Sequence, residues 1–458
     1  MPNNLKEMIY QKYIAPTEIH RERFIGVEAE LPIVCLSGSA TDHNVSRKAF
    51  SEAVKQFGFT PKKFDDKGRC HEAENAANGD IFSFDCSYNN FEISFGKEKN
   101  LPEIDRRFQS YVSFMNSELI KDQHLLTGMG INPFYKHCKN DFIPTGRYKM
   151  LEGYLGKSSQ WKCHKAFHKY PHYGAFSSAL QVQLDVEKNN LTETIRIFSL
   201  LEPFKTVLFA NSVMEDEPDL LCTRDMLWED STHGINPHNV GIYETVPETV
   251  DELSEYISLT SIFCTERDQK YMFFKPVPFA KYINESEIDC EYYENGTYRQ
   301  GKLTPDISDI KYLRTYKFTD LTARGTIEFR STCTQPLSEE LSSAALYLGL
   351  IDNLPELDEI LRNDTSIYNK GYSACELRKM LNKEIYPFFV DKKTLTETLI
   401  KILSLAEKGL KTRALGEETY LKPLFARAEQ LLPPAREMKQ KLHAGMTMPE
   451  IVKEYSKI

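Results

Sequence analysis

The sequence predicts an α+β fold, in which a β-sheet with one polar face is followed by a mostly helical C-terminal region. Two observations support this. Apolar residues alternate with acidic or amide residues in four segments, as in strands with one buried face: 25–31, 91–95, 180–186 and 326–330. From Ser338 to Ile458, apolar residues recur instead at helical spacing.

Helices and strands are expected to alternate over the first 125 residues. Pro16 ends a first helix, Ser46 suits the N-cap of a second and Gly58 suits its end, while Pro102 is favourable at the start of a third. The expected elements are a helix at Leu5–Tyr13, a strand from Phe24, a helix from Ser46, strands at Ile81–Asp85 and Phe91–Phe95, and a helix over Pro102–Leu125.

The middle of the chain is less regular. Gly128–Ser177 is rich in Gly, Pro, Tyr, His and Lys, so we expect a functional loop with little regular structure. After the strand at Leu180, helices are expected from Thr192 and over Thr249–Ser258, with a mixed segment at Asn211–Val246 between them.

A polar, acidic stretch at 283–311 is expected to be an exposed insertion, with Asn295-Gly296 as a hairpin turn. The last polar-faced strand ends at Arg330. Ser338 is expected to start a helix, because Glu339 and Glu340 in its first turn suit the helix dipole.

The 458 residues, 41% of them hydrophobic, can bury a large core, and no linker or repeat divides them. We therefore predict one large domain over 1–458. It consists of a sheet-bearing core at 1–337, including the polar insertion at 283–311, and a helical region at 338–458 packed on that core.

The charge and hydropathy patterns argue against two classes of partner, nucleic acids and membranes. The formal net charge is −9 and no basic stripe is present, so we expect no nucleic-acid partner. The apolar stretches are shorter than the ~18–20 residues of a membrane span, and the polar N-terminus does not resemble a signal peptide. We expect small-molecule substrates, no membrane partner and a cytoplasmic location; the sequence leaves the oligomeric state open.

Ten cysteines are scattered without a C-x-x-C pair, and reduced thiols are expected. One cluster, Cys163, His164, His168 and His172, has ligand types that zinc favours. Pro171 argues against a helix that would carry the last histidine. We favour a lid or substrate loop in this segment, with a zinc site as the alternative.

The polar sheet face carries the main functional signal. Glu28 and Glu30 must point the same way from one strand, as must Glu328 and Arg330 from another. Repeated carboxylates on one face repel each other, and divalent cations carrying nucleotide phosphates would neutralise them. The alternative is a solvated face, although such faces normally mix Lys, Thr and Ser.

Common phosphate-binding loops are missing. Gly153-x-x-Gly156-Lys157-Ser158 lacks the P-loop spacer, and the Gly128-Met129-Gly130 segment has Pro133 where a dinucleotide fingerprint needs glycine. A bound nucleotide is therefore expected to be held by acidic side chains acting through metal ions.

Motifs along most of the chain resemble the glutamate–cysteine ligase family, particularly its plant-like bacterial branch. The segments are Ile25–Glu30, Phe84–Ser94 (similar to L-E-P-G-G-Q-F-E-L-S), Gly128–Gly130 with Pro144–Met150, Leu180–Asp185 (similar to V-Q-V-N-L-D), Leu208–Ser212 (L-F-A-N-S), Arg224 with Trp228, Glu328–Arg330 (similar to E-M-R), and Gly409–Leu421. Their order matches the family's.

This resemblance implies a glutamine synthetase-like curved antiparallel sheet flanked by helices, and an ATP-dependent carboxylate–amine ligase. Such an enzyme forms γ-glutamylcysteine from glutamate and cysteine through a γ-glutamyl phosphate, the first step of glutathione-type thiol synthesis. Phosphoryl transfer needs charge neutralisation, so Mg²⁺ (two or three ions) is implied beside ATP as co-substrate.

The resemblance also implies roles for residues. The implied metal ligands are Glu28, Glu30, Asp85, Glu92, Gln181 and Glu328. Arg330, with Glu328, is implied as catalytic, because its fork of donors suits a phosphoryl group. The implied substrate-binding residues are Arg147, Arg224, Gln183, Asp185 and Trp228; the two arginines could instead form structural ion pairs, and Gln183 and Asp185 could cap the sheet edge.

The turn at Asp85–Asn90 departs from the family's pattern, being one residue longer and without its glycines. A different amino acid or amine acceptor is therefore the alternative to cysteine. Two more distant alternatives are a guanidino-type kinase, which would phosphorylate its acceptor stably, and a nucleotide-binding regulator without catalysis. The complete acidic set argues against the regulator.

Overall fold

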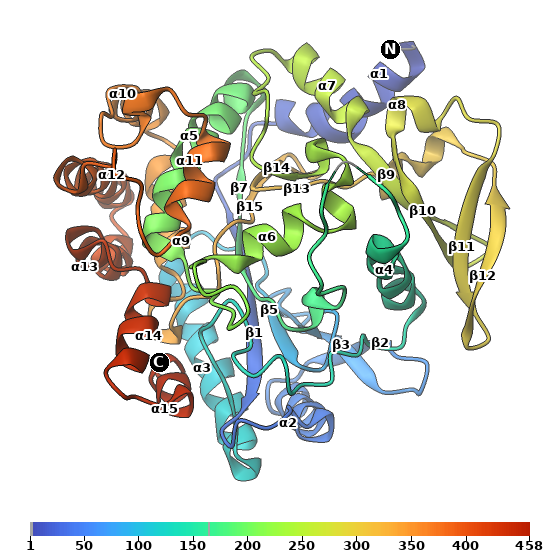
Figure 1. The fold of residues 1–458 in the computed structure, drawn as a ribbon, viewed down its shortest axis with the longest axis horizontal. Coiled ribbons are helices and arrows are strands. Elements are labelled where there is room, and N and C mark those ends of the chain that lie inside the picture. Colours follow the sequence, from blue (N-terminus) through green and yellow to red (C-terminus); the bar gives the residue numbers. More distant parts are fainter. Residues whose placement is uncertain (1–2, 164) are drawn as a thin grey trace.

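The computed structural model describes residues 3–163 and 165–458 and confirms the predicted α+β class. A nine-stranded sheet has the order β14-β15-β7-β1-β5-β4-β3-β2, with β6 pairing β1 as well, and all its pairs are antiparallel. The strands are β1 (Ile25–Cys35), β2 (Thr60–Phe64), β3 (Cys70–Glu74), β4 (Ile81–Phe84), β5 (Asn90–Ser94), β6 (His124–Leu126), β7 (Leu180–Asp185), β14 (Thr319–Leu321) and β15 (Thr326–Phe329). Helices flank this sheet (Figure 1).

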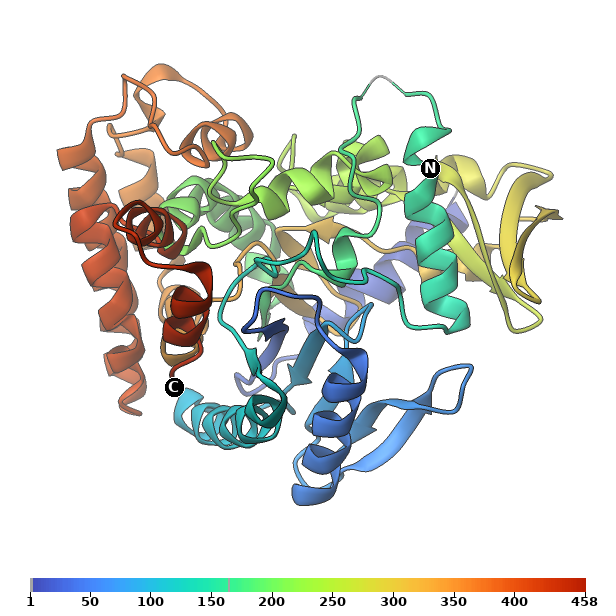
Figure 2. The ribbon, with the colours of Figure 1, turned by 60° about the horizontal axis from the view of Figure 1, so that its bottom comes forward.

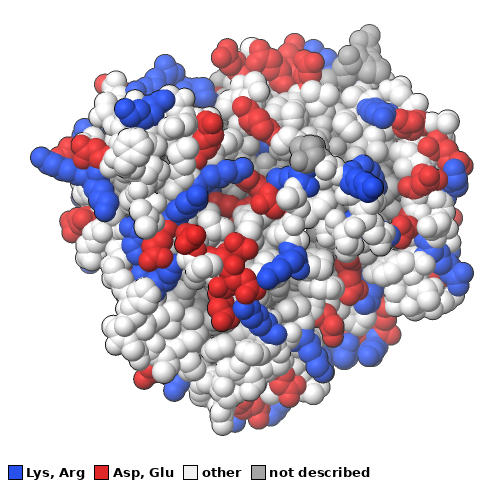
Figure 3. Space-filling model, in the orientation of Figure 1, with Lys and Arg blue, Asp and Glu red and all other residues white. Residues whose placement is uncertain are grey.

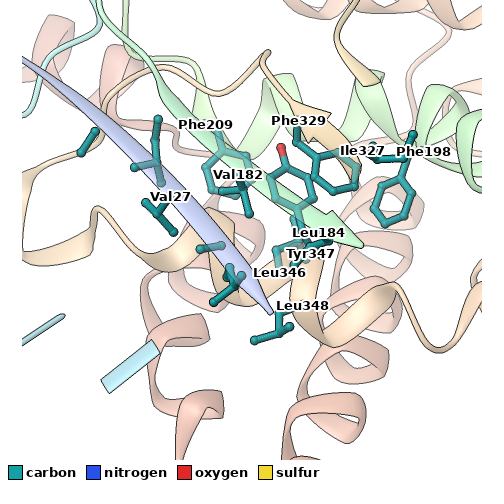
Figure 4. Close-up of a cluster of buried hydrophobic side chains, with 14 of the residues drawn as sticks. Val27, Val182, Leu184, Phe198, Phe209, Ile327, Phe329, Leu346, Tyr347 and Leu348 are labelled. Carbon is teal, nitrogen blue, oxygen red and sulfur yellow. The ribbon is translucent and has the colours of Figure 1, made fainter. Parts of the chain in front are cut away.

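The four polar-faced segments all form strands, and they lie next to each other as β15-β7-β1-β5. The apolar side chains of β1, β7 and β15 lie against α5 (Leu191–Phe209) and α9 (Ser342–Leu350), as Figure 4 shows. Phe91 of β5 packs instead against Phe50 of α2 (His43–Gln56). Phe329 of β15 stacks on Tyr347 of α9 with ring centroids 4.1 Å apart, and Phe198 of α5 lies 4.6 Å from the Phe329 ring. Packing on this face leaves the opposite, polar face for function.

The predicted helical C-terminal region is confirmed. Its helices are α9, α10 (Leu354–Arg362), α11 (Ala374–Leu381), α12 (Lys392–Arg413), α13 (Lys422–Gln430), α14 (Pro434–His443) and α15 (Met448–Tyr455). They gather on one side of the molecule, at the left of Figures 1 and 2. The buried side chains of α9 to α13 join the same apolar core as those of the large sheet. Those of α15 pack in a separate, smaller cluster that includes Val34 of β1.

A second, four-stranded sheet lies on the other side (Figures 1 and 2). It comprises β9 (Ser261–Arg267), β10 (Lys270–Pro278), β11 (Ile288–Glu294) and β12 (Thr297–Leu303). The hairpin at Asn295-Gly296 is confirmed, since β11 and β12 pair across it. The prediction that 283–311 is an exposed insertion is only partly confirmed. Strand β12 is mostly exposed, but Asp309 is fully buried. Strand β11 also pairs with β10, which the sequence did not reveal.

Further helices complete the fold: α1 (Asn3–Ile9), α2 (His43–Gln56), α3 (Leu101–Leu119), α4 (Gly146–Gly156), α6 (Thr223–Glu229), α7 (Val250–Leu259) and α8 (Phe279–Tyr282). The short strands β8 (Val240–Gly241) and β13 (Tyr316–Lys317) form a parallel pair. In the part of the chain that the structure describes, no helix has both the length and the apolar character needed to cross a bilayer.

Several predicted boundaries were wrong. Asp42, whose side chain accepts from Asn44 N, caps α2, so Ser46 lies inside that helix. Helix α3 ends at Leu119 instead of Leu125, because the chain turns into β6 to pair with β1. Ser338 lies in a 3₁₀ turn, and α9 begins at Ser342.

The predicted loop at 128–177 contains a helix, α4. Thr145 caps it by accepting from Tyr148 N, and Tyr154 and Leu155 are buried. Its apolar residues do not gather on one face, so helical periodicity did not reveal it.

Candidate active site

A cavity of about 550 Å³ lies over the polar face of the large sheet. Strand pairing explains its acidic floor: Glu30 of β1 lies opposite Glu92 of β5, and Glu328 of β15 lies opposite Asp320 of β14. Glu28 lies opposite Gln181 of β7. Directly paired residues point to the same face, so side chains from distant segments meet in the cavity. The floor consists of Glu28, Glu30, Asp85, Glu92, Gln181, Asp320 and Glu328.

Three floor carboxylates, Glu28, Glu30 and Glu92, are hard to ionise without a cation. Burial, together with the charge of Glu328, raises the pKa of Glu28 to about 7. Burial, together with the charge of Asp85, raises the pKa of Glu30 to about 8 and that of Glu92 well above its usual range. Each carboxylate therefore opposes ionisation of the next, as the alternation predicts.

Contacts within the floor leave an oxygen unsatisfied. Glu30 accepts from Ala179 N and from Gln181 Nε2, both at 2.8 Å. The other end of the same amide, Gln181 Oε1, is buried without a hydrogen-bond partner among the described residues. A buried acceptor with no donor is costly, and a bound cation would satisfy it.

The donor set fits a hard cation, since every candidate ligand offers oxygen. Nevertheless, within residues 3–163 and 165–458 no three His, Cys, Asp or Glu side chains converge closely enough to hold an ion as they stand. The side chains would have to rotate to bind one. Glu328 would also have to share its charge, because it forms an ion pair with Arg330.

Arg330 lies beside the floor, where it forms an ion pair with Glu328. Burial opposes its charge, but Glu328 and Asp320 raise the pKa of the guanidinium above its usual range. The guanidinium lies 5.7 Å from the centre of the Tyr316 ring. Lys12, Arg147, Arg224, Lys311, Arg314 and Arg324 add positive charge around the cavity. The cavity thus combines an acidic floor with basic walls, which suits a polyanion bridged by cations.

On the outer face in Figure 3, acidic and basic side chains are interspersed.

Arg224 and Trp228, both on α6, reach the cavity. Arg224 Nη1 donates to Thr332 O at 3.3 Å, while its Nε is buried without a partner in the described structure. The neighbouring Asp225 accepts two bonds, at 2.8 and 3.0 Å, from Arg378 of α11. A helix of the C-terminal region therefore anchors α6 and positions its two cavity residues.

Arg147, at the start of α4, also lines the cavity, and no described residue gives it a hydrogen bond or ion pair. A basic side chain left unpaired beside an acidic floor is available for an anionic ligand. The structural ion pair considered from the sequence is therefore not formed by Arg147.

Two expected substrate residues lie apart from the cavity lining. Gln183 Nε2 donates to Glu328 Oε1 at 2.7 Å and to Glu28 Oε1 at 3.1 Å, and its Oε1 accepts from Arg324. Asp185 accepts from Phe24 N at 3.3 Å, at the end of the sheet. The structure therefore places Gln183 beside Glu28 and Glu328 on the polar face, where it holds both carboxylates, and Asp185 at the sheet edge.

Several other residues that line the cavity were not identified from the sequence. Asp320 is buried, which with the charge of Glu328 raises its pKa to about 7. Its strand is only three residues long, too short for alternation to stand out. Arg314 and Tyr316 follow a 3₁₀ segment, and Tyr148 lies on the unpredicted α4. Only the tertiary fold brings these segments to the sheet.

Among the described residues, the members of the predicted zinc cluster do not converge as a metal site, although His172 Nδ1 is buried there without a hydrogen-bond partner. His168 Nε2 contacts Leu227 O at 2.8 Å, and its Nδ1 accepts from Tyr170 N. Cys163 Sγ contacts Lys165 O, and His164 lies outside the described residues. The end of the loop, at Tyr173 and Gly174, lines the cavity, as a substrate loop would.

No protein-family model matches the chain. Curated relatives do match. The chain is 23% identical over 325 residues to the chloroplastic glutamate–cysteine ligase B of Oryza sativa subsp. japonica, covering 68% of this chain and 59% of that protein. It is also 23% identical over 308 residues to the chloroplastic glutamate–cysteine ligase of Brassica juncea, covering 64% of this chain and 54% of that protein. These matches confirm the predicted resemblance to the family, although the chain spans less than two thirds of either relative.

Two solved structures match the chain at lower sequence identity and with low TM-scores. A glutamate–cysteine ligase of Francisella tularensis in complex with AMP covers 96% of this chain, and the match covers 89% of that chain, with 11% identity and a TM-score of 0.44. A bifunctional glutathione synthetase of Pasteurella multocida covers 99% of this chain, with 52% of that chain matched, 11% identity and a TM-score of 0.37.

Proposed function

We propose that the protein is an ATP-dependent ligase that joins the γ-carboxylate of glutamate to an amine, through a γ-glutamyl phosphate. Cysteine is the acceptor that the resemblance to the family implies. The observation that carries this proposal is the cavity itself. Its floor gathers buried and half-buried carboxylates beneath Arg147 and Arg224, most of them on the strands that carry the family-like motifs. The catalytic unit we propose is the whole of residues 1–458, because α9 to α13 share the core of the sheet, α15 packs on Val34 of β1, and α11 anchors α6.

The roles that we propose for the side chains follow from their charges. Arg147 and the free Nε of Arg224 would bind carboxylates of glutamate, and Trp228 would pack beside them. Arg330 would stabilise charge on the phosphoryl group as it moves from ATP to the γ-carboxylate. Attack of the amine nitrogen on the acyl carbon would then break the carbon–oxygen bond to phosphate and release a proton.

Glu28, Glu30, Asp85, Glu92, Gln181 and Glu328 would hold Mg²⁺. When bound, Mg²⁺ neutralises phosphate oxygens and polarises the phosphoryl group. The unsatisfied Gln181 Oε1 and the raised carboxyl pKa values support this assignment.

Phosphate release tests the proposal. The purified protein is mixed with ATP, Mg²⁺ and glutamate, and single amines are added in turn, with mass spectrometry of the products. We expect release that needs both glutamate and an amine, with a γ-glutamyl product. A stably phosphorylated acceptor would favour the guanidino-type kinase, and nucleotide binding without any turnover would favour the regulator.

Mg²⁺ binding should strengthen as pH rises from 6 to 8. Glu28 and Glu30 have pKa values of about 7 and 8, so protons compete with the cation below those values. Each displaced proton should tighten binding by up to about tenfold per pH unit. Titration with Mg²⁺ in the presence of a non-hydrolysable ATP analogue, followed by thermal shift, measures this. Equal affinity at pH 6 and 8 would contradict the assignment of these two ligands.

A second acceptor class, an amine other than cysteine, is favoured by one observation. The wall of the cavity beside Arg330 is aromatic, formed by Tyr173, Trp228, His233 and Tyr316.

A further inference from the structure

Four rings of the cavity lining pack into one cluster, which we call the aromatic wall: Tyr173, Trp228, His233 and Tyr316. The centroid of Trp228 lies 5.4 Å from that of Tyr173, 5.4 Å from that of His233 and 4.8 Å from that of Tyr316. His233 and Tyr316 are 4.5 Å apart. Such spacings are typical of packed aromatic clusters, so the wall is a built feature of the fold.

The wall is more apolar than the rest of the cavity. Leu151 and Leu155 of α4 extend it. The His233 ring makes no hydrogen bond to any described side chain or backbone group, and its Nδ1 is buried. Burial lowers the pKa of His233 to about 3, so the ring is neutral at physiological pH. The wall therefore offers ring faces and aliphatic surface, with no charge of its own.

The position of the wall identifies its occupant. The Tyr316 ring lies against the Arg330 guanidinium, which we assign to the transferring phosphoryl group. The adenine of ATP is separated from that group by the ribose and two further phosphates. The acceptor, in contrast, must bring its nitrogen to the acyl carbon directly beside the phosphoryl group. The wall thus borders the acceptor position.

The cavity lining also includes a basic set that suits the nucleotide better. It consists of Lys12, Lys311, Arg314 and Arg324, together with the chain around Thr322. Four basic side chains favour the polyphosphate. This leaves the aromatic wall to a less charged group.

We propose that the acceptor is an amine carrying an aromatic side group, such as an aromatic amino acid or arylalkylamine. This inference rests on the proposed ligase function and replaces cysteine as the acceptor. The amine nitrogen bonds to the acyl carbon of γ-glutamyl phosphate, phosphate leaves with the electrons of the carbon–oxygen bond, and one amine proton is released. The side group stacks on Trp228 and Tyr316, burying apolar surface that the compact thiol of cysteine would leave exposed to water.

Two measurements test the inference separately from the function. Hydroxylamine, which has no side group, traps an acyl phosphate as the hydroxamate. If glutamate, ATP and Mg²⁺ give no hydroxamate, both the ligase function and this inference are overturned. If hydroxamate forms, kcat/KM is compared for L-phenylalanine, phenethylamine and L-cysteine. We expect at least one aromatic amine to exceed cysteine by about tenfold or more. Preference for cysteine, or equal use, overturns the inference and leaves the function standing.

Variants test whether the aromatic wall sets the preference for an aromatic amine over cysteine. In Trp228→Leu the ratio of aromatic amine to cysteine should fall about tenfold, since a ratio cancels any general loss of activity. Phe388→Ala, at a side chain that is 99% exposed, is the control and should keep the parent ratio. An unchanged ratio in Trp228→Leu overturns the inference.

A binding measurement covers the case in which Trp228→Leu fails to fold. The chain has two tryptophans, so Trp161→Phe leaves Trp228 as the single emitter. Phenethylamine should change its fluorescence saturably, whereas L-cysteine at equal concentration should not. No saturable change with phenethylamine overturns the inference.

Discussion

Arg330→Lys is expected to reduce the rate of phosphate release by about 10³-fold or more, the order of effect of an arginine that stabilises a transferring phosphoryl group. Lysine keeps the positive charge and the attraction to Glu328. It lacks the planar fork of donors, so it cannot contact two phosphoryl oxygens and a carboxylate together. Substrate KM values should change far less than kcat, because the lost contact matters most in the transition state.

Arg362→Lys is the matched control. This arginine pairs with Asp358 on α10, and its side chain is 63% exposed. The control should keep parent activity. If Arg330→Lys retains more than about a tenth of the parent kcat, a loss of under about 1.4 kcal/mol, Arg330 does not perform the assigned role.

Glu30→Gln is expected to affect activity and stability in opposite directions. Activity should fall by about 10³-fold, since a ligand contributing several kcal/mol of charge neutralisation is removed. Without metal, however, the variant should be more stable than the parent at pH 8. The neutral amide avoids the cost of burying a charge among carboxylates, and its oxygen can still accept from Ala179 N.

The direction of the pH effect follows from the raised pKa. Glu30 has an ordinary value of 4.5 and a folded value of about 8, so the folded state holds a proton that the unfolded state has lost between these values. The stability of the metal-free parent therefore falls as pH rises from about 4.5 to 8. The variant lacks this contribution, and its melting temperature should exceed that of the parent by a few degrees at pH 8 but not at pH 5.

Glu397→Gln, at an exposed site on α12, is the control for stability. Thermal denaturation in EDTA at both pH values gives the comparison. A variant that melts below the parent at pH 8 would show that other groups in the fold stabilise the Glu30 carboxylate, and would contradict a raised pKa for this residue.

Local pattern was sufficient for the polar-faced strands. Alternation in 25–31, 91–95, 180–186 and 326–330 predicted strands, and all four are found. It also predicted that Glu28 and Glu30 share a face, because the side-chain period of a strand is two. Asn295-Gly296 similarly predicted its hairpin, since its backbone preference is local.

Local pattern failed where the conformation depends on partners elsewhere in the chain. Helix α4 has no apolar stripe. Strands β9 and β10 show no clear alternation of polar and apolar residues. The packing of α4 on β10 nevertheless stabilises both of these elements. The extension of the predicted third helix beyond Leu119 was wrong because pairing with β1 outweighs helix propensity there.

For the site, the sequence by itself determined the chemical character: carboxylates and amides repeated on one sheet face, with an arginine at its end. The tertiary structure alone decided which residues meet there. Strand register places Asp320 opposite Glu328 and Glu92 opposite Glu30, and α4 and α6 bring Arg147 and Arg224 over them. Side-chain alternation is a property of a few consecutive residues, whereas register and helix packing depend on the apolar core of the whole chain.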